Sequence, residues 1–361
     1  MSSTSRHFDL IIIGAGPAGA TLARLLGGHM SILLVDSRNM DDEDVQGKCC
    51  GGLLAPDARE WLARLSLALP SSVLDIAQPL TVRALDMQSG DTSSYPRHYF
   101  NLNRTRFEKW LLSLLPVSVT RLYSHRCINI NRDGQKTTVT LKGAEGLKNY
   151  HAPLLVAADG AGSILRKKLQ HPAASSYLAI QERYNYSEVK APPPASSEYG
   201  ALLHPQTTDF YGWIIPKHNG FLLGAAFKPD KRAIQRRWAA FKNALARYGY
   251  IFQKPAHRQG CQLLRPRPSD IFYGLPGVFC IGEAAGLISP SSAEGFSYAF
   301  ASAQHLALAL IDSRHPQKAL QNYRANCRPL HLNIAWKRVK SYVMYTPTLR
   351  RLVMRSPLPA V

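Results

Sequence analysis

Three glycines near the start of the chain have the spacing of a phosphate-binding turn. The apolar run 8–14 ends on Gly14. Together with Gly16 and Gly19, this residue forms the pattern G-x-G-x-x-G, and an Ala- and Leu-rich segment covers 17–27. This order predicts a buried strand, a tight turn and a helix. Glycine permits the turn, leaves room for a pyrophosphate against bare backbone and lets the helix pack closely on the strand. The helix N-terminus offers N–H groups and a positive dipole end to phosphates.

An acidic residue completes this nucleotide-binding pattern. A second apolar run over 31–35 ends on Asp36, 22 positions after Gly14, and its carboxylate can accept hydrogen bonds from ribose hydroxyls. NAD and FAD share the ADP half, so the motif does not separate them. The alternative is an ordinary βαβ unit whose glycines serve only packing. The predicted cofactor contacts in this segment are Gly14, Gly16, Pro17, Ala18, Gly19, Asp36 and Ser37.

Two later segments also place an acidic residue at the end of a predicted strand. Asp159 and Gly160 follow the run 154–158, and this pair alone is typical of a turn that caps a helix. Gly282 and Glu283 follow the run 277–281, where a carboxylate can bind the hydroxyls of a ribityl chain. A helix N-terminus near Gly295 can direct N–H groups at the N1/O2 edge of a flavin. The predicted contacts here are Asp159, Gly160, Gly282, Glu283, Gly286, Gly295 and Phe296.

The elements around these motifs predict an α/β fold, α+β overall, with a Rossmann-like parallel sheet interrupted by an antiparallel-sheet domain. Helical spacing predicts helices over 103–115, 231–248 and 294–311, and strand patterns mark 154–158, 177–186, 209–215, 221–227 and 277–282. The first part of the predicted FAD-binding domain covers 1–174 and includes a small β-meander at 117–142, and its second part covers 271–313. Between them lies a predicted substrate domain at 175–270, and a basic helical region follows at 314–361.

Composition narrows the class of protein. The 361 residues carry a net charge of +20, and 314–361 hold ten Lys and Arg but no Asp or Glu. Such a region is either a solvated basic face or a contact with an anionic membrane surface. No nucleic-acid motif accompanies the charge, and the six cysteines show no metal-ligand spacing, so we expect neither nucleic acid nor a metal. We expect a cytoplasmic protein, peripheral at the inner membrane face.

The three strand-end motifs, in this order, resemble the FAD-binding fingerprints of the p-hydroxybenzoate-hydroxylase-like flavoproteins. Lys48-Cys49-Cys50-Gly51-Gly52 resembles the Cys-Gly-Gly loop of the geranylgeranyl reductase family. The segment 211–217, Tyr-Gly-Trp-Ile-Ile-Pro-Lys, resembles that family's Tyr-x-Trp-x-Phe-Pro-Lys, and Arg104 resembles an arginine that opens a cofactor-contacting helix. The likeness is closest to the CbrA-like bacterial members and covers roughly 8–310. Glu283 and Ile215 depart from the family's Asp and Phe.

The resemblance implies FAD and a reaction on an apolar substrate. It implies that hydride passes from flavin N5 to a C=C bond of an isoprenoid or polyprenyl lipid, with Cys50 as the candidate proton donor. Further implied cofactor contacts are Lys48, Cys49, Cys50, Gly51 and Arg104. Implied substrate contacts are Tyr211, Trp213, Pro216 and Lys217. Two alternatives stay open: an FAD-dependent monooxygenase of an aromatic or apolar small molecule, and a low-turnover flavin protein that binds membrane surfaces.

Overall fold

The structure, a computed structural model, describes residues 7–42, 48–134, 136–169, 171–172, 174–188, 198–230 and 232–355. The chain divides into two compact units. Unit 1 comprises Met1–Gln46, Phe107–Ser175 and Leu264–Trp336, and unit 2 comprises Gly47–Arg106, Ser176–Leu263 and Lys337–Val361. The chain therefore crosses between the units several times, and segments distant in sequence fold together in each.

Unit 1 is built on a mostly parallel sheet. Its strands are β1 (Leu10–Ile13), β2 (Ile32–Val35), β7 (Val119–Leu122), β11 (Leu154–Ala157), β17 (Gly274–Leu275) and β18 (Val278–Cys280), in the order β17-β18-β11-β1-β2-β7. All pairs are parallel except β17–β18. Strands β1, β2 and β11 consist of short Ile, Leu, Val and Ala runs, as expected of a sheet covered on both faces. The predicted parallel sheet is confirmed.

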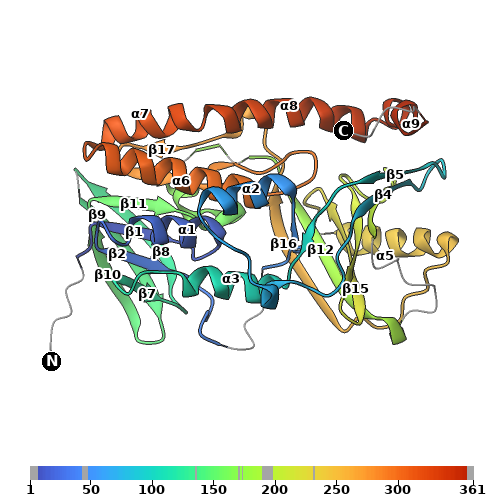
Figure 1. The fold of residues 1–361 in the computed structure, drawn as a ribbon, viewed down its shortest axis with the longest axis horizontal. Helices are drawn as coiled ribbons and strands as arrows, with labels where there is room; N and C mark the ends of the chain where they lie inside the picture. The colour runs from blue at the N-terminus through green and yellow to red at the C-terminus, as the bar shows by residue number, and fades with distance from the viewer. Residues whose placement is uncertain are drawn as a thin grey trace. The chain divides into compact units, whose positions relative to one another are not determined.

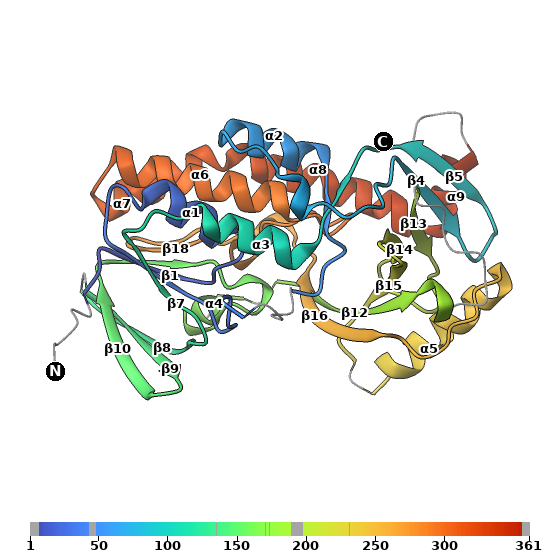
Figure 2. The same cartoon turned by 60° about the horizontal axis from the view of Figure 1, so that its bottom comes forward.

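Helices cover one face of this sheet and a small antiparallel meander covers the other (Figures 1 and 2). Helix α1 (Pro17–Leu26) packs against α6 (Phe296–Asp312), and α6 packs against α7 (Pro316–Asn326). On the meander, Val139 and Leu141 join one core cluster with Ile11 and Leu33 of the sheet. The short α4 (Ile164–Lys168) follows β11.

The prediction of a meander over 117–142 is wrong at both ends. The meander consists of β8 (Arg126–Asp133), β9 (Lys136–Gly143) and β10 (Gly146–Ala152). Residues 119–122 form β7, which pairs in parallel with β2 and so belongs to the large sheet. A strand with this alternating pattern fits either the meander or the parallel sheet. Alternation indicates that one face of the strand is buried, but it does not indicate which strand is the partner.

Unit 2 is built on a seven-stranded sheet with the order β16-β12-β15-β14-β13-β4-β5. These are β4 (Thr81–Asp86), β5 (Thr92–Pro96), β12 (Ser176–Asn185), β13 (Glu198–Leu203), β14 (Gly212–Lys217), β15 (Gly220–Phe227) and β16 (His257–Leu264). Helix α5 (Ile234–Leu245) packs Trp238 and Phe241 into the core of this sheet with Tyr184 and Phe221. The mostly antiparallel character is as predicted, and the pair β13–β4 is parallel.

Unit 2 also takes segments that the sequence-based division placed elsewhere. Residues 47–106 were expected in the FAD-binding domain, but β4 hydrogen-bonds to β13 and completes the seven-stranded sheet. They also contain the antiparallel pair of β3 (Leu53–Leu54) and β6 (Phe100–Asn101), together with α2 (Pro56–Arg64). Helix α3 (Arg104–Ser113) follows as predicted.

The C-terminal region is helical, as expected. Helix α8 (Arg328–Tyr345) follows α7, and α9 (Pro347–Arg355) ends the described chain; residues 356–361 lie outside it. Among the described helices, none combines the length and the apolarity needed to cross a bilayer.

Candidate functional site

The turn between β1 and α1 has the geometry that its glycines predict. Gly14 adopts φ +106°, and a Cβ there would lie 2.4 Å from the carbonyl oxygen of Ala158. A Cβ on Gly19 would lie 1.9 Å from the carbonyl oxygen of Gly14, so helix and turn touch backbone to backbone. A Cβ on Gly16 would meet nothing within 4 Å, and Gly16 leaves the N-terminus of α1 without a side-chain cap. Open space therefore lies where the pyrophosphate is predicted, next to Pro17 and Ala18.

Asp36 lies at the carboxyl end of β2, and its acceptor sites are already used. Its Oδ2 accepts from the Ala15 N–H at 2.9 Å and from Arg38 Nη2 at 3.2 Å. Its Oδ1 accepts from the Arg38 N–H at 2.9 Å and from Arg38 Nε at 3.1 Å. A carboxylate has about four acceptor positions. Ribose binding by Asp36 stays a prediction. It requires the Arg38 guanidinium to release at least one of its hydrogen bonds to the Asp36 carboxylate.

Arg38 is a residue that the sequence analysis missed. Its Nη1 donates to Glu108 Oε2 at 2.7 Å, and Glu108 is a buried carboxylate on α3. Burial lowers the pKa of Arg38, but Glu108 and Asp36 outweigh burial and raise it. Seventy positions separate Arg38 from Glu108, and no spacing pattern in the sequence connects them. The described structure thus puts a fixed cation beside the predicted ribose site.

Asp159 lies at the carboxyl end of β11, next to the turn of β1. Its Oδ2 accepts from the Ile164 N–H at 2.8 Å, while its Oδ1 is buried and has no hydrogen-bond partner within the described residues. Burial raises the pKa of Asp159. Gly160 adopts φ +76°, which a side chain would strain. A buried acceptor without a partner fits a ligand that brings its own donor.

The third motif follows β18 as a turn of 3₁₀ helix over Gly282–Ala285. The Gly282 N–H donates to Ser302 Oγ at 2.9 Å, and Glu283 Oε1 accepts from the Leu264 N–H at 2.9 Å. Part of the Glu283 carboxylate thus holds the backbone where β16 ends, in place of the shorter Asp of the resembled family. Gly286 adopts φ +82° beside the carbonyl oxygen of Asp270.

The N-terminus of α6 completes this group. Gly295 is its N-cap and provides no side-chain cap. The Phe296 ring packs edge-on against Phe107 of α3 at 5.3 Å between ring centroids. The Phe296 side chain therefore belongs to the core of unit 1, and any contact with a cofactor would come from its backbone.

The strand ends of unit 1 bring these three motifs together. Ala158 touches Gly14, and a Cβ on Gly282 would lie 3.1 Å from the Ala18 Cβ. The strands β1, β11 and β18 are parallel neighbours, so their carboxyl ends meet at one edge of the sheet. This edge is where open α/β sheets bind their ligands.

The other predicted residues lie in unit 2, around the Cys-Cys-Gly-Gly loop. Cys50 Sγ accepts from the Gly52 N–H at 3.4 Å and from Arg104 Nη1 at 3.8 Å. A Cβ on Gly51 would lie 2.3 Å from Ile215 Cδ1, and Gly52 adopts φ +73°. Glycine is required at position 52 by its positive φ and by the carbonyl oxygen of Leu102, while Gly51 lets the loop approach the tip of the Ile215 side chain on β14.

Two further residues of unit 2 hold this loop from its carbonyl side. Gln181 Nε2 donates to the carbonyl oxygen of Cys50 at 3.4 Å, and Trp213 Nε1 donates to Gln181 Oε1 at 3.1 Å. Cys261 Sγ donates to the carbonyl oxygen of Cys49 at 3.4 Å. The neighbouring Cys261 thiol, together with burial, raises the pKa of Cys49. Sequence reasoning missed Gln181 and Cys261, because no motif links either to the loop.

The predicted substrate residues surround β14. The ring of Tyr211, which precedes β14, meets the ring of Trp213 on β14 edge-on at 5.7 Å between centroids. Trp213 is buried and covers Gly224 of β15. The Pro216 carbonyl oxygen accepts from Asn101 Nδ2 at 2.6 Å. The buried Lys217 Nζ donates to Asn101 Oδ1 and to the carbonyl oxygen of Leu102. In this structure Lys217 holds β6, and its substrate role stays a prediction. Lys48 is exposed.

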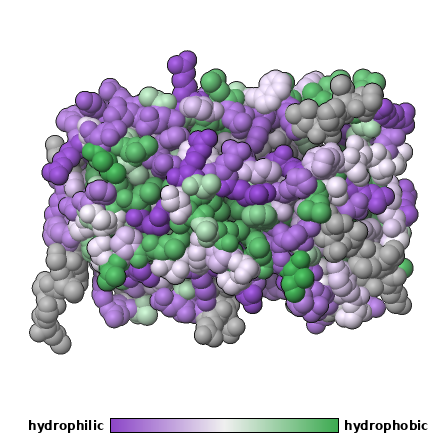
Figure 3. Space-filling model, viewed as in Figure 1, coloured by the Kyte–Doolittle hydropathy of each residue, from purple (hydrophilic) through white to green (hydrophobic). Residues whose placement is uncertain are grey.

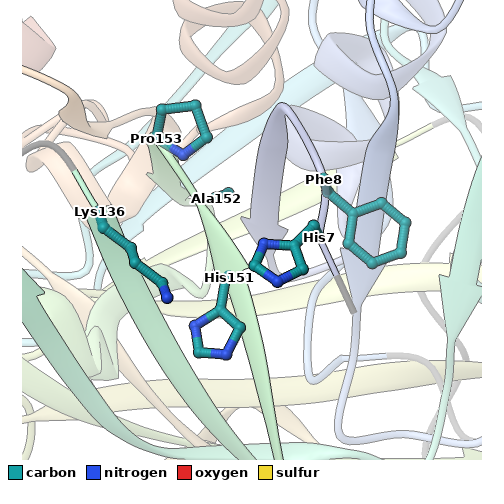
Figure 4. A pocket seen from close by; sticks show the side chains of 6 residues that line it. All are labelled: His7, Phe8, Lys136, His151, Ala152 and Pro153. Atoms are coloured by element: carbon teal, nitrogen blue, oxygen red, sulfur yellow. The ribbon is translucent and has the colours of Figure 1, made fainter. Parts of the chain in front are cut away.

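One surface pocket of about 290 Å³ contains none of the predicted site residues. His7, Phe8, Lys136, His151, Ala152 and Pro153 line it (Figure 4). The His7 and His151 rings stack at 5.0 Å, and His151 Nδ1 hydrogen-bonds Thr138 Oγ1. These contacts tie the meander to the chain before β1, and we assign the pocket no ligand.

The chain matches the family of FAD binding domains over residues 7–336 and therefore belongs to this family. It is 37% identical over 352 residues to Protein CbrA of Escherichia coli O6:H1. This alignment covers 97% of this chain and 93% of that protein. Its fold is similar to that of a geranylgeranyl bacteriochlorophyll reductase-like protein of Thermoplasma acidophilum, with a TM-score of 0.81 and 17% identity. The match covers 99% of this chain and 94% of that protein. It is also similar to the p-nitrophenol 4-monooxygenase PnpA of Pseudomonas putida, with a TM-score of 0.71, 17% identity and coverage of 96% and 92%. The resemblance inferred from the sequence is confirmed.

FAD is the cofactor, and the strand ends of unit 1 fit its dinucleotide part. Gly16 leaves open space for a pyrophosphate, and neither α1 nor α6 carries a side-chain cap at its N-terminus. The buried Asp159 Oδ1 has no hydrogen-bond partner among the described residues, so it can accept a hydrogen bond from a cofactor hydroxyl. The individual contacts that we assign from the sequence stay predictions.

Proposed function

We propose that this FAD-dependent oxidoreductase reduces a C=C bond of an isoprenoid lipid. The bound cofactor supplies the two electrons as hydride from N5 of its reduced ring. The observation that carries the proposal is the Cys50 sulfur at 3.8 Å from Arg104 Nη1, in a loop whose backbone is held from two sides. The resemblance of the Cys-Cys-Gly-Gly loop to the geranylgeranyl reductase family and the similar fold of a reductase-like protein support the same reaction.

Cys50 supplies the proton in this proposal. An isolated alkene resists hydride attack, so a proton delivered to the second carbon as hydride adds to the first lowers the barrier. The Cys50 S–H bond breaks, the C–H bond forms, and the thiolate that remains lies beside the Arg104 guanidinium. Solvent then returns the proton to Cys50. Two hydrogens are added to the substrate, and the two-electron-reduced cofactor is oxidised.

Gln181 and Trp213 act as positioning residues. The chain of hydrogen bonds from Trp213 Nε1 through Gln181 to the Cys50 carbonyl oxygen fixes the loop on the sheet of unit 2. We propose that the Tyr211 and Trp213 rings also line the place where an apolar chain binds, because large rigid rings bury much apolar surface at little entropic cost. An isoprenoid substrate would suit a protein that works in the cytoplasm at a membrane face.

The test is an anaerobic single turnover. Holoenzyme is reduced with dithionite, mixed with geranylgeraniol, and followed by the return of oxidised flavin absorbance, with product mass measured afterwards. We expect a gain of two hydrogens per double bond reduced. Cys50→Ser is expected to slow reoxidation about 100-fold, the lower range for loss of a general acid. Cys327→Ala is the matched control, because Cys327 is a buried cysteine at the end of α7 in unit 1, whereas the loop belongs to unit 2.

Three results would overturn this proposal. Unchanged reoxidation in Cys50→Ser removes the thiol from the mechanism. A hydroxylated product formed only with oxygen and NADH or NADPH would identify a monooxygenase, the alternative favoured by the fold of the p-nitrophenol enzyme. Failure to turn over with every donor, together with bound flavin, would leave the low-turnover binding protein.

A further inference from the structure

Helix α8 turns a stripe of large apolar side chains toward solvent. Leu332, Trp336, Val339 and Tyr342 are 61%, 64%, 58% and 69% exposed. Their spacing of four, three and three positions puts all four on one face of a helix with 3.6 residues per turn. We call these four residues the α8 stripe.

The stripe is not the packing face of this helix. The opposite side carries Ile334, which is fully buried in the core of unit 1, and Ser341, which is also buried. Helix α8 therefore already has an inward face, and its apolar residues outside that face do not contribute to the core. Exposed apolar side chains that gather on one face of a helix are typical of a contact surface.

The charges around the stripe have one sign. Arg328 is exposed one helical turn before Leu332, and Arg338 and Lys340 are partly exposed within the length of the stripe. No Asp or Glu occurs from residue 313 to the end of the chain. Along the upper edge of Figure 3, where Figure 1 draws α7 and α8, apolar groups stand among hydrophilic ones.

Four cations in the described part of the C-terminal region form ion pairs within unit 2. Arg350 pairs with Asp86, Arg351 and Arg355 pair with Asp91, and Lys337 lies 4.0 Å from Asp57. Helix α9 is therefore held to β4 and β5 by its arginines. Arg350 is almost fully buried in its ion pair, whereas Arg328 at the start of α8 is exposed.

We propose that the α8 stripe docks on the surface of a bilayer that contains anionic lipids. Its Trp and Tyr suit the headgroup level, its Leu and Val reach the acyl boundary, and its cations face anionic headgroups. A nucleic acid would use the cations but leave Leu332 and Val339 without a role. The inference is independent of the reaction proposed above, since binding to vesicles requires no turnover.

The test is cosedimentation of the holoprotein with vesicles of phosphatidylcholine, alone or with 30% phosphatidylglycerol. We expect binding only with phosphatidylglycerol, weakened by 0.5 M NaCl because salt screens surface charge. The triple variant Leu332→Ser, Trp336→Ser, Tyr342→Ser is expected to bind at least about tenfold more weakly. Arg328→Gln with Lys340→Gln is expected to lose roughly fivefold per cation.

The matched control is Leu147→Ser with Ile251→Ser, which removes two exposed apolar residues on other elements and is expected to bind like the wild type. Flavin absorbance and thermal unfolding check that each variant is folded. Equal binding of the wild type to both vesicle types overturns the proposal, as does unchanged binding of the triple variant. A wild-type oligomer that the triple variant dissociates, without vesicle binding, would identify the stripe as a protein interface instead.

Discussion

At the scale of single residues, the site depends on polar side chains that are paired and at least partly buried. Arg38 joins Asp36 to the buried Glu108, and Arg104 lies beside the sulfur of Cys50. Removal of one partner from such a pair leaves the other desolvated and unpaired, which costs far more than an exposed pair gains. Electrostatic contacts therefore fix the positions of the groups that the cofactor and substrate are predicted to meet.

Lys217 should make the stability of the protein depend on pH. Burial lowers the pKa of Lys217 to about 8 from 10.5, although Asp75 raises it in part. The unfolded chain then holds more protons than the folded chain between these two pKa values, so stability rises with pH across this window. The destabilisation is fully present below pH 8 and is removed above pH 10.5. We expect the difference to reach up to ~3 kcal/mol.

The measurement is urea unfolding of the wild type and Lys217→Met at pH 7.5, 9 and 10.5. Tyrosines also titrate near the upper end, but they contribute to both proteins and cancel in the comparison. The wild type is expected to gain stability relative to the variant as the pH rises. Parallel curves for the two proteins would show that Lys217 is not held at a lowered pKa.

At the scale of elements, the loop of Cys49 to Gly52 fits its strand because side chains are absent. Gly51 faces Ile215 of β14, and Gly52 lies against the carbonyl oxygen of Leu102 beyond β6. The family's Phe at the position of Ile215 is replaced here by a side chain whose Cδ1 fills the space above Gly51. The absence of a side chain at Gly51 thus matches the volume of the Ile215 side chain on β14. A pair of substitutions at these two positions can test this match.

Gly51→Ala should destabilise the protein by about 1–3 kcal/mol, because its new Cβ would lie 2.3 Å from Ile215 Cδ1. Ile215→Val removes that atom and alone should cost about 1 kcal/mol. The double variant is expected to be more stable than Gly51→Ala alone. Thermal unfolding and flavin content of the four proteins check this, and purely additive losses would contradict the packing.

At the scale of the whole molecule, unit 2 takes its elements from three parts of the chain. Its last part, Lys337–Val361, contains α9, whose Arg350 Nε donates to Asp86 Oδ2 at 2.8 Å at the end of β4. Both side chains are almost fully buried. The C-terminal helix therefore belongs structurally to a sheet that begins more than 200 residues earlier in the sequence.

Arg350→Met should destabilise unit 2 by about 3–5 kcal/mol, because Asp86 is left as an unpaired buried charge. Asp86→Asn combined with Arg350→Met is expected to recover part of this loss. Calorimetric unfolding of the three proteins measures both effects, and Arg236→Met, at an exposed position on α5, provides the control. A loss below about 1 kcal/mol in Arg350→Met would show that the pair contributes little.

The sequence by itself determined the local features of the nucleotide site. The spacing of Gly14, Gly16 and Gly19 encodes a turn that only glycine can form, and apolar runs before Asp36, Asp159 and Glu283 mark strand ends. Such features depend on backbone conformation within a few residues, so they can be recognised without the fold. The family and FAD followed from the order of these motifs.

Only the tertiary structure decided which distant residues meet. It paired Arg38 with Glu108, Gln181 with the Cys50 carbonyl and α9 with β4. It also moved 119–122 into the parallel sheet and turned the α8 stripe outward. Contacts across 70 to 264 positions leave no periodic trace in the sequence. They depend on chain crossing and side-chain volume, and not on local propensity.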